Sequence, residues 1–311
     1  MPYFSIIIPL YNKSKYIEET LQSIINQDFL DFEIIVVDDG STDNSVAIVK
    51  RFEDKRLRLY RQENKGVSVA RNKGISYAKG TYIALLDADD IWYNNHLTAL
   101  KLQIIQFPDA GLYCNNYEIY LDEKTKRNAK FNFSYKTDCL IVRDFFTASI
   151  INSVAWTSAV GFCKDKFNSV GGFDANLDTS EDLDLWIKLA LRYKVSFNPN
   201  LTMSYRYYIH DSLTKKETNL IRLNFINSYK TEEAKNDGLK RYLDINRYAL
   251  AIRCKTLKEF DIYKTAKKQI LISNLNFKQK LLLYLPSNVL IGLKKIQATL
   301  IKNNIYISAF K

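Results

Sequence analysis

Hydrophobic and polar positions follow two different periods over the first hundred residues of the chain. Four apolar runs have the length of buried strands, at residues 4–9, 33–38, 57–61 and 82–87. Apolar residues recur at helical spacing over residues 14–26, 43–52, 68–78 and 94–106. We expect the carboxylate of Asp43 to cap the second of these helices. Strands and helices in this order predict an α/β fold, with a mostly parallel sheet flanked by helices on both faces.

The remainder of the chain is less regular at first and then becomes helical. The pattern predicts a strand over 112–121, a helix over 180–193, and two strands over 195–197 and 203–208. From about residue 215 onward the apolar spacing is helical. We therefore predict an α/β domain over residues 1–214 and a helical extension over residues 215–311.

The distribution of charge sets the extension apart from the rest of the chain. Residues 1–209 hold 25 basic and 26 acidic residues, whereas residues 210–311 hold 20 basic and 8 acidic residues. Segment 289–296 places apolar residues beside lysines, which suits a helix lying on an anionic membrane. A packed helix with solvated lysines explains the same pattern equally well. A nucleic-acid surface is not predicted, because aromatic and basic residues do not alternate and no nucleic-acid-binding motif is present.

Composition excludes several classes of protein. With 47% hydrophobic and 25% charged residues, the chain is neither collagen-like nor mostly disordered. No apolar run reaches the about 18 residues of a membrane span, and the first residues lack the basic start of a signal peptide. The four cysteines are far apart, so neither a zinc site nor a disulfide framework is predicted. These features predict a cytoplasmic location.

Acidic residues follow two of the predicted strands, at the edge where open parallel sheets bind ligands. Asp38-Asp39-Gly40 ends the second strand, where a carboxylate could accept from the N–H of uracil. A simple turn built on Asp and Gly is an equal alternative. Asp87, Asp89 and Asp90 end the fourth strand, and a divalent cation would relieve their mutual repulsion. The alternative is a solvated acidic loop that caps the next helix.

Three further positions are candidates for a site. Ser180-Glu181-Asp182 starts a predicted helix, where acidic residues either favour the helix dipole or supply a general base. His210 follows the last predicted strand and could contact a metal or a diphosphate, although a lone histidine is more often structural. Arg71 lies near the start of a helix, where it could face a phosphate or a base, or simply solvent. His96 is interpreted as structural.

These motifs, taken in order, resemble the inverting glycosyltransferases of family 2. The segments that carry the resemblance are residues 5–12 (SIIIPLYN), 36–43 (VVDDGSTD), 66–72 (GVSVARN), 85–90 (LLDADD), 170–174 (VGGFD), 180–182 (SED), and Tyr205-Arg206 with His210 and Ser212. The resemblance covers roughly residues 3–214. Each motif alone is weak, and the order of all seven makes the resemblance specific.

The resemblance implies a GT-A fold, which is a Rossmann-like sheet flanked by helices, together with a nucleotide-sugar donor and a divalent cation, Mn²⁺ or Mg²⁺. Residues 1–110 would form the nucleotide-binding half, and residues 111–214 the acceptor-side half. By position, the motifs assign the nucleotide site to Pro9, Tyr11, Asp39, Arg71 and Asp87, the metal to Asp89 and His210, and the catalytic base to Asp182 with Glu181 beside it. The role of Asp90 stays open.

The implied reaction moves a hexose or N-acetylhexosamine from a nucleotide sugar, with UDP as the expected carrier, to a hydroxyl of a glycan or a lipid-linked glycan. Asp182 would take the hydroxyl proton, and a single displacement would invert the anomeric carbon. The expected role is synthesis of a surface polysaccharide or lipopolysaccharide, with the basic tail on the inner face of the membrane. The alternatives are a nucleotidyltransferase that uses the same acidic metal site, and an inactive nucleotide-sugar-binding protein.

Overall fold

The computed structural model describes residues 1–177, 179–208 and 219–302, and the chain divides into two compact units. The first unit is Met1–Arg143 with Ser153–Ser212, and the second is Asp144–Asn152 with Leu213–Lys311. Residues 144–152 belong to the second unit because their helix, α5 (Phe145–Ala148), packs on α10 (Asp237–Leu257). The rings of Phe146 and Tyr242 lie 6.2 Å apart in this contact.

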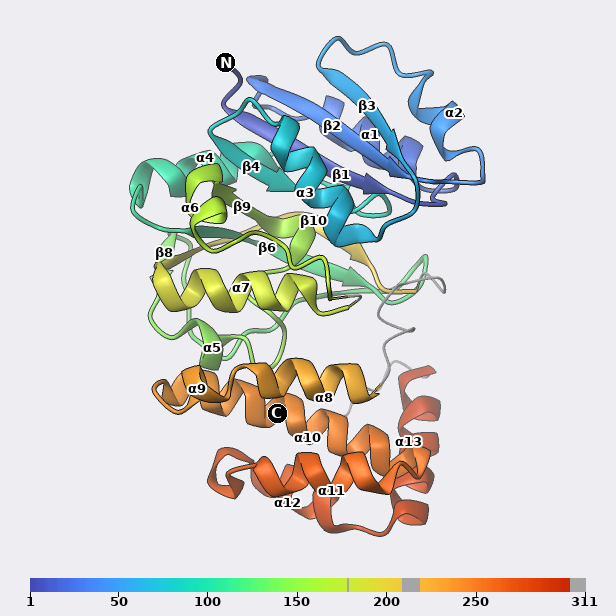
Figure 1. Ribbon diagram of the computed structural model, residues 1–311, viewed down its shortest axis with the longest axis vertical. Helices are drawn as coiled ribbons and strands as arrows, with labels where there is room; N and C mark the ends of the chain where they lie inside the picture. The colour runs from blue at the N-terminus through green and yellow to red at the C-terminus, as the bar shows by residue number, and fades with distance from the viewer. Residues whose placement is uncertain (178, 209–218, 303–311) are drawn as a thin grey trace. The chain divides into compact units, whose positions relative to one another are not determined.

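A ten-stranded sheet runs through the first unit in the order β3-β2-β1-β4-β9-β6-β10-β5, with β7 beside β6 and β8 beside β10 (Figure 1). The strands are β1 (Phe4–Leu10), β2 (Phe32–Asp39), β3 (Leu57–Gln62), β4 (Tyr82–Leu85), β5 (Ile91–Trp92), β6 (Leu112–Tyr120), β7 (Lys126–Asn128), β8 (Leu140–Val142), β9 (Val160–Cys163) and β10 (Val195–Arg206). The four strands β1 to β4 are parallel to one another, as predicted, and β9 is antiparallel to both β4 and β6. Where two strands were predicted near residue 200, β10 is a single strand with register shifts between Asn198 and Met203.

Helices cover both faces of the parallel strands, which explains why β2 is buried at every position. Those of the first unit are α1 (Ile17–Ile25), α2 (Ser45–Val49), α3 (Val67–Tyr77), α4 (His96–Gln106), α6 (Lys164–Ser169) and α7 (Glu181–Arg192). In Figure 1, α3 crosses in front of the strands and α1 lies behind them. Close packing of α3 requires Gly74, since a Cβ there would meet the Ile7 side chain at 2.6 Å.

The helix α2 is shorter than predicted and begins later. Asn44 precedes it and makes no side-chain cap. The Asp43 carboxylate instead accepts the backbone amides of Ser45 at 2.9 Å and Ser14 at 3.0 Å. These bonds connect the loop after β2 to the loop after β1. The Ser45 hydroxyl also donates to Asp43 at 2.5 Å. Desolvation raises the pKa of Asp43, but the hydrogen bond from the Ser45 hydroxyl and those from the two amides outweigh it and lower the pKa to about 2.

The second unit is helical, with α10 at its centre. Around it lie α5, α8 (Asn219–Ser228), α9 (Lys230–Glu233), α11 (Phe260–Gln269), α12 (Phe277–Tyr284) and α13 (Ser287–Lys302). The buried guanidinium of Arg247 pairs with Glu233 at 2.7 Å and Asp244 at 3.1 Å, which fixes α9 against α10. Within the described part of the chain, no helix combines the length and the apolar character needed to cross a bilayer.

Candidate active site

The loops that follow β1, β2 and β4 meet at one edge of the sheet, because β1 lies between the other two strands. The Asn12 side chain accepts the amides of Thr42 at 2.8 Å and Asp43 at 3.3 Å, and so fastens the first loop to the second. Asn12 has a φ of 51°, and Gly40 in the facing loop has a φ of 79°. Both loops therefore turn sharply at the carboxyl ends of their strands, where the predicted site residues cluster.

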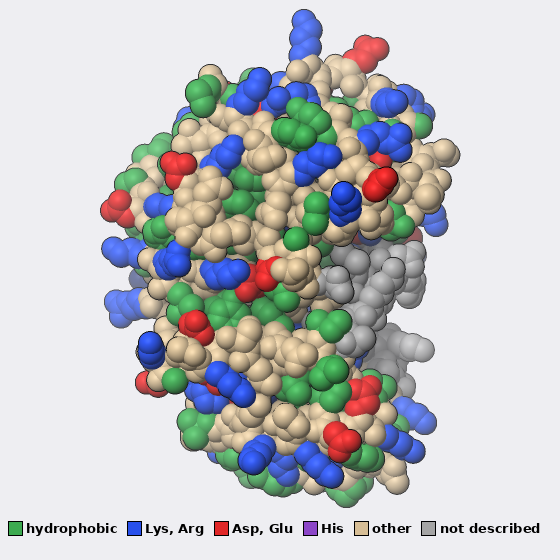
Figure 2. Space-filling model, in the orientation of Figure 1, with side chains coloured by type: hydrophobic (Ala, Val, Ile, Leu, Met, Phe, Trp, Pro, Cys, Tyr) green, Lys and Arg blue, Asp and Glu red, His purple; other side chains and the backbone are tan. Residues whose placement is uncertain are grey.

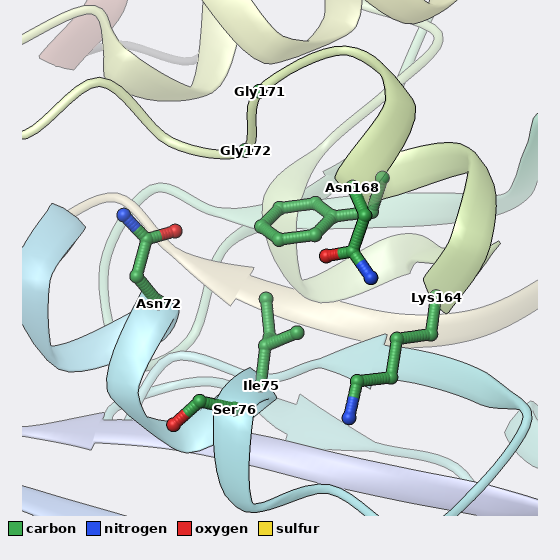
Figure 3. Close-up of a pocket in the computed structure, with 8 residues that line it drawn as sticks. Asn72, Ile75, Ser76, Lys164, Asn168, Gly171 and Gly172 are labelled. Carbon is green, nitrogen blue, oxygen red and sulfur yellow. The ribbon is translucent and has the colours of Figure 1, made fainter.

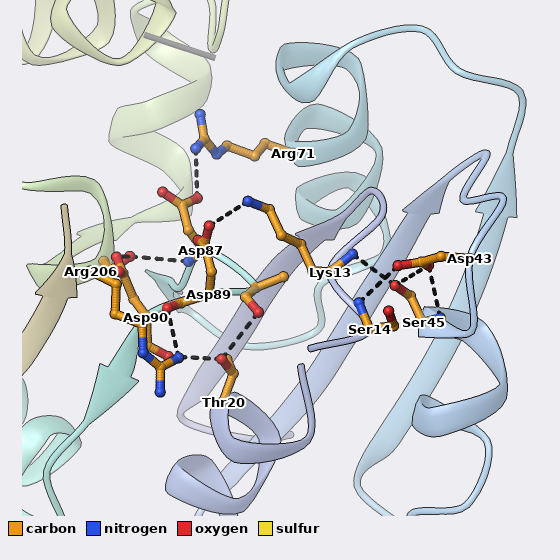
Figure 4. Close-up of polar contacts among 12 residues, drawn as sticks. Lys13, Ser14, Thr20, Asp43, Ser45, Arg71, Asp87, Asp89, Asp90 and Arg206 are labelled. Atoms are coloured by element: carbon orange, nitrogen blue, oxygen red, sulfur yellow. Dashed lines mark hydrogen bonds and ion pairs between the residues drawn. The ribbon is translucent and has the colours of Figure 1, made fainter. Parts of the chain in front are cut away.

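A buried arginine joins the acidic end of β4 to the start of α7. Arg71 Nη2 donates to Asp87 Oδ1 at 2.7 Å (Figure 4). Arg71 Nη1 donates to Glu181 Oε1, also at 2.7 Å. Arg71 is 4% exposed. Burial alone would lower the pKa of Arg71, but the charges of Asp87 and Glu181 raise it above its usual value. The guanidinium is thus a permanent cation that holds together two carboxylates from distant parts of the chain.

The two carboxylates at the start of α7 occupy different environments. Burial, followed by the charge of Asp182, raises the pKa of Glu181 from 4.5 to about 7. Asp182 is half-buried, with Oδ1 accepting the Leu183 amide at 2.7 Å and Oδ2 lying 3.4 Å from the Thr157 hydroxyl. Ser180 precedes the helix with a φ of 67° and does not cap it with its side chain. Because its pKa is about 7, Glu181 is partly protonated near neutral pH, next to Asp182.

The three carboxylates after β4 have three different partners. Asp87 bonds to Arg71, as described, and Asp89 Oδ2 lies 2.5 Å from the ammonium of Lys13 (Figure 4). Asp90 is 2% exposed and accepts the Ser158 hydroxyl at 2.6 Å. Burial and the charges of Asp89 and Asp87 raise the pKa of Asp90 well above its usual value. Asp90 is therefore a buried residue that makes hydrogen bonds within the protein, whereas the side chains of Asp87 and Asp89 are partly accessible to solvent.

Asp90 and Arg206 fasten β10 to the end of β4. The backbone amide of Arg206 donates to Asp90 Oδ1 at 3.2 Å, and Arg206 Nη1 donates to the carbonyl oxygen of Asp89 at 2.9 Å. The guanidinium also pairs with Glu19 of α1. Nothing in the sequence pattern pointed to Lys13, Glu19 or Ser158 as partners, since each lies 68 residues or more from the group it contacts.

Asp39 lies at the end of β2 and is 4% exposed. Its Oδ1 accepts the Gln62 side chain and the Lys65 amide, each at 2.8 Å, and its Oδ2 accepts the Gly66 amide at 2.9 Å. Three of the about four acceptor positions of the carboxylate are thus occupied. By this count, one acceptor position on Oδ2 is left over.

The other predicted residues are placed as follows. Pro9 lies in β1 and pairs with Val37 of β2, and Tyr11 follows β1 with 44% of its surface exposed. His210 lies outside the described residues. His96 is fully buried, stacks on Trp92 with ring centroids 4.1 Å apart, and hydrogen-bonds to Thr202 at 2.9 Å. Burial lowers the pKa of His96 to about 3, in agreement with a structural role.

The acidic residues fit a hard divalent cation held by few protein ligands. Among the described residues, no group of three or more His, Cys, Asp or Glu side chains is arranged to hold a metal ion. Asp87 and Asp89 are close enough that the charge of Asp87 raises the pKa of Asp89, after the larger effect of burial. The Lys13 ammonium already occupies a cation position on Asp89. Mg²⁺ and Mn²⁺ are commonly bound by one or two carboxylates together with substrate phosphates, and two carboxylates meet that requirement.

A separate pocket of about 290 Å³ opens between α3 and α6 (Figure 3). Its walls include Asn72, Ile75, Lys164 and Asn168, with Gly171 and Gly172 forming one rim. Asn72 bonds through its side chain to both backbone groups of Phe173, and the Lys164 ammonium donates to the carbonyl of Ala78 at 2.7 Å. None of the predicted site residues lines this pocket, so it is distinct from the acidic site.

The comparisons with known proteins agree with this architecture. Residues 5–171 match the family model described as glycosyl transferase family 2. The chain is 45% identical over 119 residues to glycosyltransferase GlyG of Streptococcus pneumoniae, which is 37% of this chain and 39% of that protein. It is 27% identical over 219 residues to the putative teichuronic acid biosynthesis glycosyltransferase TuaG of Bacillus subtilis, covering 70% of this chain and 83% of that one.

A solved structure of S. aureus TarS 1–349 in complex with UDP-GlcNAc superposes with a TM-score of 0.63 at 21% identity, over 86% of this chain and 79% of that chain. The large sheet with flanking helices is thus a GT-A-type α/β fold followed by a helical region. The chain belongs to glycosyltransferase family 2. It spans 39% to 46% of the length of GlyG and of two uncharacterized Rickettsia glycosyltransferases that it matches.

Proposed function

We propose that this chain is an inverting glycosyltransferase that moves a sugar from a UDP-sugar to a hydroxyl group of a glycan or a lipid-linked glycan. The observation that carries the proposal is the Arg71 bridge, which connects Asp87 at the end of β4 to Glu181 beside Asp182. The bridge ties a carboxylate at a ligand-binding sheet edge to the neighbour of the candidate base, which supports a site shared by both. The UDP-GlcNAc complex of TarS supports a UDP-sugar donor, and the name of TuaG supports a surface-polysaccharide acceptor.

In this proposal, Asp182 is the general base. The acceptor oxygen forms a bond to the anomeric carbon while the bond from that carbon to the diphosphate oxygen breaks. The hydroxyl proton passes to Asp182, and the electron pair of the broken bond leaves with UDP. One displacement inverts the anomeric configuration. Glu181, with its raised pKa of about 7, limits the negative charge beside the base near neutral pH.

The donor would be held by residues from the three loops. Pro9 and Tyr11 would line the nucleoside, and the acceptor position left on Asp39 Oδ2 suits the N3–H of uracil. Asp89, with Asp87 alongside and His210 as a further candidate, would hold Mn²⁺ or Mg²⁺, which supplies positive charge to the diphosphate. Arg71 orients Asp87 toward the same site.

The test is sugar transfer or UDP release from a panel of UDP-sugars with Mn²⁺ or Mg²⁺, after thermal-shift screening has selected the donor. Asp182→Asn should lower kcat by about 10²-fold or more, because the base is lost, while UDP affinity is retained. The matched control is Asp184→Asn, two residues further along α7, where the carboxylate pairs with Lys188 at 2.5 Å. Full activity in Asp182→Asn would refute the assignment of the base.

We also propose that the helical unit contacts an anionic membrane. Three exposed apolar side chains of α12, Phe277, Leu281 and Tyr284, are spaced four and three residues apart. The next helix repeats this spacing with Val289, Leu293 and Ile296. Each group therefore lies on one helix face.

Lysines accompany these apolar faces, at positions 278, 280, 294 and 295, and no acidic residue follows Asp261. In the lower part of Figure 2, basic and hydrophobic side chains lie side by side over the helical elements. Apolar faces bordered by lysines match the boundary between anionic headgroups and acyl chains.

Vesicle co-sedimentation of the full chain tests the membrane proposal. The double variant Phe277→Ser/Leu281→Ser should bind anionic vesicles several-fold more weakly than the wild type. The control is Leu102→Ser/Ile105→Ser, which removes two exposed apolar side chains from α4. Equal sedimentation of both variants, or equal binding to zwitterionic vesicles, would exclude this surface.

A further inference from the structure

The loop after β1 carries a lysine whose position relates directly to the acidic end of β4. The ammonium of Lys13 lies 2.5 Å from Asp89 Oδ2, and the two side chains are 19% and 20% exposed. Asp89 is the carboxylate to which the proposed function assigns the cation. A protein cation and a metal ion would therefore compete for the same oxygen atoms.

The backbone of Lys13 is fixed, so its ammonium can move only within the reach of its own side chain. The Lys13 amide donates to the Ser45 hydroxyl at 2.8 Å. The Lys13 carbonyl accepts the amides of Tyr16 at 2.9 Å and Ile17 at 3.0 Å, at the start of α1. The side chain thus extends from an anchored position, across the edge of the sheet, to a residue 76 positions away in the sequence.

The charges around Asp89 explain why a cation is needed there. Asp87 already pairs with Arg71, and Asp90 is turned inward to Ser158. The Arg206 guanidinium bonds to the backbone carbonyl of Asp89 rather than to its carboxylate. Among the residues that the structure describes, Lys13 is therefore the cation that pairs with the partly buried Asp89 carboxylate.

We propose that Lys13 is a resident counter-cation of the donor site. It holds Asp89 in place in the free protein and competes with the divalent cation for that carboxylate. When the metal binds, the ammonium is displaced but stays within a side-chain length of Asp89, where it can contact the diphosphate of the donor. Lys13 is thus a positioning residue that sets the metal affinity and adds to diphosphate binding. This inference rests on the proposed function.

The two roles predict opposite effects of removing the charge. In Lys13→Met, Mn²⁺ alone should bind at least about fivefold more tightly, because the competing cation is gone. UDP at saturating Mn²⁺ should bind several-fold more weakly, because the diphosphate loses a cationic partner. Lys13→Arg keeps the charge and should restore both values toward those of the wild type.

Mn²⁺ binding is measured by the loss of the free-ion electron paramagnetic resonance signal, and UDP binding by calorimetry, both without any sugar transfer. Lys15→Met is the matched control, since Lys15 lies two residues away, is exposed, and gives the same change of net charge. Lys15→Met should leave both affinities unchanged. Unchanged or weaker Mn²⁺ binding in Lys13→Met, or equal effects of the two substitutions, would overturn the inference.

The experiment on Lys13 and the test of the proposed function can fail independently of each other. Sugar transfer that depends on Asp182, together with unchanged Mn²⁺ binding in Lys13→Met, refutes only the role of Lys13. Tighter Mn²⁺ binding in Lys13→Met without sugar transfer by the wild type supports the counter-cation and refutes the transferase assignment.

Discussion

Replacing Arg71 by methionine should destabilise the first unit substantially. The substitution keeps a long side chain but removes two charge-assisted hydrogen bonds of 2.7 Å from a residue that is only 4% exposed. Removing one partner of a buried ion pair costs about 3–5 kcal/mol, because the other charge is left without compensation. Two features of the structure reduce this cost. The Asp87 side chain is 31% exposed and can be hydrated, and the raised pKa of Glu181 allows that group to take up a proton.

We therefore expect Arg71→Met to lose about 2–4 kcal/mol of unfolding free energy at pH 8. The loss should be smaller at pH 6, where Glu181, with its pKa of about 7, is mostly protonated. Urea unfolding followed by tryptophan fluorescence measures it, because Trp92, Trp156 and Trp186 all belong to the first unit.

Arg61→Met is the control for this measurement. Its guanidinium also bonds to a carboxylate, Asp38, at 3.0 Å, but the Arg61 side chain is 58% exposed. Asp38 itself is buried, but it keeps the Ser41 amide as a donor at 3.1 Å, and water can reach the position of the exposed guanidinium. The expected loss is therefore about 1–2 kcal/mol, below that for Arg71. If the two variants lose the same free energy, burial of Arg71 does not determine the strength of the bridge and the reasoning fails.

Three further predictions follow from the site. The pKa of Glu181 is raised from 4.5 to about 7, so the wild-type protein loses stability as the pH rises through this window. Between pH 5 and pH 8, the unfolding free energy of Glu181→Gln should therefore rise by about 1–3 kcal/mol relative to that of the wild type. A difference in urea unfolding that does not change with pH would contradict this. Ser158→Ala removes the 2.6 Å donor to buried Asp90 and should cost about 1–3 kcal/mol in the same assay, whereas a change near zero would show that Asp90 does not need it. Asp39→Asn replaces one acceptor oxygen by an amide donor, so UDP should bind about tenfold more weakly in calorimetry, and unchanged affinity would remove Asp39 from the nucleoside site.

Much of the α/β fold could be predicted from hydrophobic patterning. The four apolar runs of the first hundred residues are β1 to β4, and the helical spacings between them correspond to α1, α2 and α3. Prediction was less accurate where local signals were weak. The strand β10 has register shifts between Asn198 and Met203, so its hydrophobic pattern predicts two strands instead of one. Similarly, α5 contributes to the helical unit although it lies between strands of the sheet in sequence, since long-range packing on α10 determines its place.

The candidate site shows the same division between local and long-range information. Hydrophobic patterning alone predicts that Asp39, Asp87, Asp89 and Asp90 stand at the ends of strands, because strand length and parallel order place those positions at one edge of the sheet. The role of each carboxylate follows instead from the three-dimensional contacts. Arg71, Lys13 and Ser158 reach Asp87, Asp89 and Asp90 from 16, 76 and 68 residues away. The burial and charge pairing of each carboxylate depend on which distant side chain contacts its oxygen atoms. Periodicity along the chain does not specify these long-range contacts.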